Sequence, residues 1–200
     1  GRARATFTWQ QEAESATIVG SVGFVDDQDC SGGRYVYSTV SCMGGFRDDC
    51  PSLSFTVNVP AAGDYYICAR AMGEGWGSNS FYVDIDGQPY PPYQFEIPQN
   101  GDVWDWIWTI VHEDHQPETP VHWTAGAHTV RFWSREPDAR LDVLLVTDDP
   151  AALPAPITPV ATSSPTPTRL SAWRTEVLPD EAVGPYSSLA LDGIGYPHIS

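Results

Sequence analysis

Regular alternation of apolar and polar residues marks the most ordered stretches of this chain. Leu53, Phe55, Val57 and Val59 alternate with small polar residues until Pro60, and similar alternation recurs in residues 80–86, 127–134 and 141–147. A period of two is typical of strands that bury one face. Gly- and Pro-rich segments separate the runs, so the pattern predicts an all-β chain of short strands joined by turns.

Two pairs of these runs are close enough in sequence to predict hairpins. Residues 127–134 and 141–147 flank the polar turn Arg135-Glu136-Pro137-Asp138-Ala139, and residues 53–59 precede Gly63-Asp64 and the run 65–71. Pro, Asp and Gly at such positions favour tight turns. We therefore expect each pair to form adjacent antiparallel strands.

Three acidic residues fit this strand pattern poorly. Asp142 lies inside a run that is otherwise apolar up to Val146, where an unpaired carboxylate would be costly. Glu12 and Glu14 fall on one face of a strand, where their charges repel unless a cation lies between them. The alternative is that Asp142 bonds Arg140 or a backbone amide while both glutamates are solvated.

Aromatic and histidine clusters need separate interpretations. Trp104, Trp106, Trp108 and Ile110 share one face of a predicted strand over residues 103–110, and we expect this row to pack on a sheet or in the core. The loop His112-Glu113-Asp114-His115 lacks the helical HExxH spacing of a catalytic zinc site, and no Ser-His-Asp order or phosphate-binding glycine loop is recognisable. The sequence therefore favours a non-enzymatic protein.

Composition and charge narrow the possible partners. The 200 residues are 42% hydrophobic, enough for a substantial core, and carry a formal net charge of -16. Such a charge repels phosphate backbones and anionic lipids, so nucleic acid is excluded as an expected partner. No apolar run approaches the roughly 20 residues needed to span a bilayer, and no signal-peptide core is recognisable, so we expect a soluble, mature segment without membrane insertion.

Four cysteines in the first third of the chain predict the compartment. None shows CxxC spacing, which favours two disulfides and an oxidising, extracellular setting over a zinc site. Four cysteines allow three pairings. We favour Cys42 with Cys50, which closes a short loop, and Cys30 with Cys68; buried free thiols in a reduced compartment are the alternative.

Five motifs in order carry a resemblance to a known family. They are Glu12-Ala13-Glu14, SLSFTVNVPAAGDYYICARA, the loop into NSFYVDIDG, the WDW segment, and TAGAHTVRFWSREPDARLDVLLVTDD. Together they resemble the β-jelly-roll carbohydrate-binding modules of families six and thirty-five. The resemblance implies a β-sandwich over roughly Thr8 to Asp149 and a structural calcium ion held by Glu12, Glu14 and Asp142, with backbone carbonyls near Arg34.

The same resemblance implies a sugar site among the loops at one edge of the sandwich. Sugars stack on exposed aromatic rings and hydrogen-bond to amide groups, so the candidates are Trp76 in the loop from Gly73 to Gly77, together with Asn79, Tyr35 and Tyr37. Many members carry an asparagine in the last loop. This chain instead has Glu136-Pro137-Asp138-Ala139, which departs from the usual pocket.

The composition changes after Asp149. We expect a jelly-roll domain over residues 1–149, an extended Pro/Thr/Ser linker over 150–169, and a β-prone tail over 170–200 with apolar positions at Leu170, Trp173, Val177, Leu189, Leu191 and Ile199. The tail resembles one incomplete copy of a repeat from secreted bacterial proteins. Two functions follow: a secreted, non-catalytic carbohydrate-binding module for polysaccharide or cell-surface glycan, or a structural subunit of an extracellular filament or adhesin that self-assembles by adding this tail as a strand to a neighbouring copy.

Overall fold

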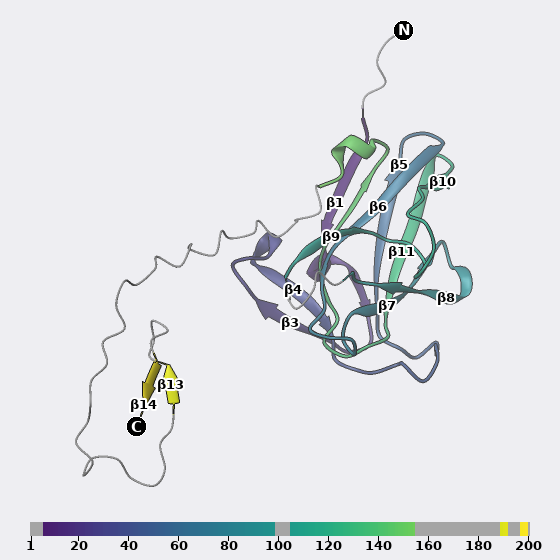
Figure 1. The fold of residues 1–200 in the computed structure, drawn as a ribbon. Coiled ribbons are helices and arrows are strands. Elements are labelled where there is room, and N and C mark those ends of the chain that lie inside the picture. Colours follow the sequence, from purple (N-terminus) through teal and green to yellow (C-terminus); the bar gives the residue numbers. More distant parts are fainter. Residues whose placement is uncertain (1–5, 99–104, 155–188, 192–196, 200) are drawn as a thin grey trace, which may run out of the picture. The chain divides into compact units, whose positions relative to one another are not determined.

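The computed structural model describes residues 6–98, 105–154, 189–191 and 197–199, and nearly all of its regular structure is β-strand (Figure 1). The chain divides into two compact units, residues 1–159 and residues 160–200. Among the described residues, no helix is long and apolar enough to cross a membrane.

The first unit consists of two antiparallel sheets. The seven-stranded sheet contains β1 (Thr8–Glu12), β3 (Val22–Asp26), β4 (Arg34–Ser38), β6 (Gly63–Met72), β9 (Ile107–Ile110), β10 (Val121–Trp123) and β12 (Arg140–Thr147). The five-stranded sheet contains β2 (Thr17–Val19), β5 (Ser52–Val59), β7 (Ser80–Ile85), β8 (Gln88–Glu96) and β11 (Gly126–Ser134). Short 3-10 turns are η1 (Ala13–Ser15), η2 (Ser31–Gly33) and η3 (Pro150–Ala152). This is the all-β sandwich that the alternation predicts.

The apolar faces of the two sheets meet in one continuous core. Phe132 on β11 lies at its centre, with edge-to-face contacts to Phe55, Phe81 and Phe95 at ring-centroid distances of 6.0, 5.8 and 6.0 Å. Tyr65, Ile67, Leu144 and Val146 supply the facing layer from β6 and β12. Burial of each such side chain stabilises the fold by about 1.5–3 kcal/mol. The face of each strand that carries the apolar residues therefore turns inward.

Both predicted hairpins are wrong. β11 pairs with β5 and β7, whereas β12 pairs with β6, β4 and β1, so residues 135–139 carry the chain from one sheet to the other. β5 and β6 also belong to different sheets. Alternation shows that one face of a strand is buried, but it does not identify the neighbouring strand. The same pattern arises when two strands pair within one sheet and when they face each other across the core.

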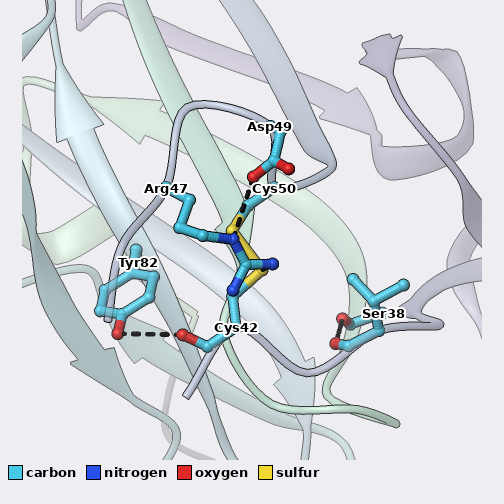
Figure 2. Close-up of a disulfide and its surroundings, with 7 residues drawn as sticks. Ser38, Cys42, Arg47, Asp49, Cys50 and Tyr82 are labelled. Carbon is cyan, nitrogen blue, oxygen red and sulfur yellow. Dashed lines mark hydrogen bonds and ion pairs between the residues drawn. A yellow bond between two sulfur atoms is a disulfide. The ribbon is translucent and has the colours of Figure 1, made fainter. Parts of the chain in front are cut away.

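The loop between β4 and β5 is closed by one disulfide. Cys42 bonds Cys50 with a Cα–Cα distance of 6.5 Å, as predicted, and the Tyr82 hydroxyl donates a hydrogen bond to the Cys42 carbonyl at 3.4 Å (Figure 2). Phe46 within this loop packs edge-on against Trp133 at 5.1 Å. The loop is therefore held against the outer face of the five-stranded sheet.

The second predicted disulfide is wrong, because Cys30 and Cys68 are separate buried thiols. Cys30 precedes η2 and packs in a small cluster with Tyr35, Met72 and Trp106. Cys68 lies inside β6 between its pairing partners Leu145 and Ile110. Burial raises the pKa of each thiol to about 12, so both are unreactive at neutral pH.

The second unit contains two short antiparallel strands, β13 (Leu189–Leu191) and β14 (Pro197–Ile199), with Leu189 opposite Ile199. The predicted linker residues 155–169 and the apolar positions Leu170, Trp173 and Val177 lie outside the described residues. The predicted division into a domain, linker and tail therefore stays a prediction.

Candidate functional site

The three predicted metal residues lie where β1, the turn η2 and β12 meet. Glu12 ends β1, but Glu14 lies in η1, so the two are not on one strand as predicted. Ser31 in η2 bridges the group: its Oγ donates to Glu12 Oε1 at 2.7 Å and its backbone amide donates to Asp142 Oδ2 at 3.1 Å. These contacts join carboxylates that are 130 residues apart in sequence (142 minus 12).

The turn can approach the glutamates closely because it contains glycine. Gly32 has a φ of 66°, and a Cβ atom there would lie 3.0 Å from Glu14 Oε1. Another residue would be strained at this φ and would press on the carboxylate. The resemblance placed backbone atoms near Arg34 beside the acids, and η2, which immediately precedes Arg34, lies there.

The acidic cluster, Glu12, Glu14 and Asp142, is short of positive charge. Glu12 Oε2, Glu14 Oε2 and Asp142 Oδ1 are buried and have no hydrogen-bond partner. Burial raises the pKa of Glu14, and the charges of Glu12 and Asp142 raise it further. Burial also raises the pKa of Asp142, against the opposing effects of Ser31 and Arg70. Orphaned buried oxygens are costly, so these atoms fit a hard cation such as calcium.

Asp142 has a partner that the sequence analysis missed. The Arg70 guanidinium on β6 pairs with the fully buried Asp142. Of the two alternative partners, Arg140 pairs with Glu74 instead, whereas the predicted backbone amide is present and is that of Ser31. Arg70 is an isolated cation within the apolar run YYICARAM, and that signal could have identified it. Within the described residues, no three His, Cys, Asp or Glu side chains are placed to hold a metal as they stand, so a cation would have to draw the cluster together.

The predicted sugar-binding tyrosines lie on the outer face of the seven-stranded sheet. Tyr35 is only 6% exposed, because Trp106 packs edge-on at 5.1 Å and the Arg140 guanidinium lies over its ring at 5.4 Å. Tyr37 is half-buried, and its ring lies so close to Gly23 that a Cβ there would be 2.1 Å from it. Neither ring therefore has an open face on which a sugar could stack.

Trp106 belongs to the row of tryptophans predicted to pack. It precedes β9 and is buried against Tyr35, whereas Trp108 is half-buried within the strand and Trp104 lies outside the described residues. Packing on the sheet is therefore confirmed for Trp106.

Trp76 is the exposed candidate, with 81% of its surface accessible. Its loop, residues 73–79, is fixed at both ends: Glu74 pairs with Arg140, and the buried Asn79 donates its backbone amide to Glu136 Oε2 at 2.9 Å. The Asn79 side-chain amide donates to Glu96 Oε1 at 3.0 Å. Asn79 thus anchors the loop, and Glu136, in the segment that departs from the family pattern, is turned inward to hold it.

Comparisons with known proteins address the fold. The sequence matches no protein-family model, and no curated protein matches it. A family 35 carbohydrate-binding module from Clostridium thermocellum is similar in structure, with 21% identity, a TM-score of 0.52 and coverage of 68% of this chain and 96% of that one. The GH26-CBM35 β-(1,4)-mannanase from Podospora anserina aligns with 16% identity and a TM-score of 0.50 over 71% of this chain and 28% of that one.

An exo-β-1,3-galactanase from Phanerochaete chrysosporium aligns with 17% identity and a TM-score of 0.48, covering 70% of this chain. The present chain spans only 29% of that enzyme's length. The fold is carried by the likeness to the family 35 module and to the mannanase, at 21% and 16% identity. Residues of the first unit therefore have the β-jelly-roll fold of a family 35 carbohydrate-binding module, as the resemblance implied.

Proposed function

We propose that the first unit is a non-catalytic carbohydrate-binding module of an extracellular protein, and that a sugar ring stacks on Trp76. The exposure of Trp76 carries this proposal, because a large aromatic side chain at 81% exposure gains little from the protein's own packing. The jelly-roll fold and the Cys42–Cys50 disulfide, which suits an oxidising compartment, support it.

The loop that carries Trp76 is anchored on both sides of this residue. The anchors are Glu74 and Asn79, so binding has little loop entropy to overcome. The formal charge of -16 repels polyanions, which makes a neutral polysaccharide the expected ligand class.

Binding to a panel of neutral polysaccharides tests this function. We expect Trp76→Ala to weaken binding at least about fivefold, which corresponds to a lost stacking contact of about 1 kcal/mol, with an unchanged fold. Tyr90→Ala is the matched control, because Tyr90 is also exposed, at 67%, but lies on β8, outside the loop that carries Trp76. Equal affinities of Trp76→Ala and the wild type, or no binding to any polysaccharide, would refute the proposal.

We also propose that the acidic cluster holds a structural calcium ion. Calcium takes about six to eight oxygen ligands, and Glu12, Glu14 and Asp142 would supply carboxylate oxygens that now lack partners. The ion would supply positive charge and no chemistry. Its role is to join the first strand, the turn η2 and the last strand.

One observation favours the alternative, a structural subunit of an extracellular filament or adhesin. β3 ends the strand order of the seven-stranded sheet, carries neither Lys nor Pro, and exposes Phe24 and Val25. Unprotected edges of this kind accept added strands. In this alternative, the C-terminal tail of a neighbouring copy would supply the added strand.

A further inference from the structure

Arg70 occupies a position that a simple calcium site would not require. Its guanidinium pairs directly with Asp142 at the acidic cluster, and its side chain is only 15% exposed. Arg34, the other nearby cation, pairs instead with Asp26 at 2.5 Å, is about half exposed, and acts on Glu14 only through longer-range charge. The cluster therefore already contains one fixed positive charge.

Arg70 also has partners that do not depend on Asp142. Its second guanidinium nitrogen donates to the Asp29 carbonyl at 2.9 Å, and the guanidinium lies over the Trp106 ring at 5.3 Å from the centroid. If the Asp142 carboxylate turned towards a cation, these two contacts would keep the guanidinium in place. Arg70 can thus share or release Asp142 without leaving the site.

The pair of Arg70 and Asp142 affects the net charge that a bound ion would meet at the acidic cluster. Three ionised carboxylates and one arginine sum to -2, which a divalent ion would neutralise, but that ion must bind within reach of a positive guanidinium. Without an ion, the arginine offsets part of the repulsion among the three carboxylates.

We propose that Arg70 is a resident counter-cation that competes with a divalent ion for Asp142 and lowers the calcium affinity of the acidic cluster. Because its guanidinium stays over the Trp106 ring, ion binding changes the charge environment of that ring. This inference rests on the proposed calcium site. Arg70 acts here as an affinity-determining residue, since it offers no oxygen ligand.

Calorimetric titration of calcium into the metal-free 200-residue chain tests the proposal. We expect Arg70→Met, which keeps much of the side-chain length without the charge, to bind calcium at least about tenfold more tightly than the wild type. Arg34→Met is the matched control and should change the affinity less than about threefold, because its charge is exposed and screened. Arg70→Met should also melt at a lower temperature in chelator and recover when calcium is added.

A second measurement uses the wild-type chain and does not depend on the variant folding. In protein labelled with 5-fluorotryptophan, the fluorine resonance of Trp106, assigned with Trp106→Phe, should shift as calcium saturates the site. Unchanged or weaker calcium binding by Arg70→Met, an equal gain in Arg34→Met, or a Trp106 resonance that ignores calcium would each overturn the role of Arg70. Absence of calcium binding by the wild type and both variants would instead refute the calcium site itself, and this inference with it.

Discussion

At the residue scale, His128 has a hydrogen-bond environment that only one protonation state satisfies. Its Nδ1 lies 2.7 Å from Asp86 Oδ2 and its Nε2 lies 2.8 Å from the Thr124 carbonyl, while its ring stacks on Trp123 at 4.6 Å. Both partners are acceptors, so both nitrogens must donate, as only the imidazolium can. Burial lowers the pKa of His128, but Asp86 and Thr124 outweigh it and raise the pKa above its usual value.

This arrangement predicts how stability depends on pH. Because the folded-state pKa of His128 is raised, its contribution is fully present below the unfolded value of about 6.5 and is lost as pH rises through the folded value. We expect the free energy of unfolding of the wild type to fall across that window, and His128→Gln to remove this part of the slope. Urea unfolding at a series of pH values measures it.

His122→Gln is the control for this prediction. His122 also contacts a carboxylate, with its Nδ1 2.8 Å from Asp64, but its side chain is 71% exposed. Because water screens this exposed contact, we expect its substitution to change the free energy of unfolding by less than about 0.5 kcal/mol. A His128 pKa at or below 6.5 by NMR titration would contradict the interpretation.

The ion pair of Asp142 and Arg70 shows what could be predicted from sequence at this scale. Asp142 was identifiable because its strand is otherwise apolar, so its need for a partner follows from the desolvation of a carboxylate alone. Its actual partner, Arg70, was not identified, because their contact depends on the pairing of β6 with β12, which brings together residues 72 positions apart. The exposure of Trp76 was predictable from its glycine-rich loop, whereas the burial of Tyr35 depends on Trp106 and Arg140.

At the element scale, alternation located the strands well but not their partners. β5, β7, β11 and β12 each match the predicted range within one residue. The hairpin expected from residues 127–134 and 141–147 is absent because residues 135–139, which resemble a turn, cross between sheets, and the chain between β5 and β6 crosses in the same way. In the crossing at residues 135–139, Ala139 is buried, and Glu136 holds the loop that carries Trp76. A loop of this length can serve either connection, and only the packing of both sheets decides.

The edge strand β3 allows an element-scale test of the filament alternative. Lysine on an edge strand opposes strand addition, so Val25→Lys should reduce any self-assembly of the full chain, as should removal of residues 165–200. Val19→Lys is the control, since Val19 is exposed on β2, an edge strand of the other sheet. Sedimentation velocity over a concentration series measures assembly. If Val25→Lys assembles as well as the wild type, or if the wild type stays monomeric at every concentration, strand addition at β3 is wrong.

At the scale of the first unit, stability depends on joining the two ends of the folded chain. β1 pairs with β12 from Thr8 opposite Thr147 to Glu12 opposite Val143, and the Phe7 amide donates to Asp148 at 2.7 Å. At the other end of this pairing lies the acidic cluster, whose like charges oppose the same contact. The β1–β12 pair is thus stabilised by a hydrogen bond at one end and opposed by repulsion between carboxylates at the other. A cation bound among those carboxylates would remove the repulsion.

Calcium should therefore stabilise the whole unit. An ion that binds only the folded state adds about 2.7 kcal/mol at a concentration of 100 times its dissociation constant, which corresponds to about 5–10 °C in the melting temperature of a unit of this size. We expect calcium to raise the melting temperature of the wild type, chelator to lower it, and Asp142→Ala to lose most of this response.

Asp142→Ala should also melt lower in chelator, because it leaves the buried Arg70 charge without its partner. Glu118→Ala removes an equal charge from an exposed position and should respond as the wild type does. A wild-type melting curve indifferent to both calcium and chelator would mean that the acidic cluster tolerates its own repulsion, with Arg70 alone as its counter-charge.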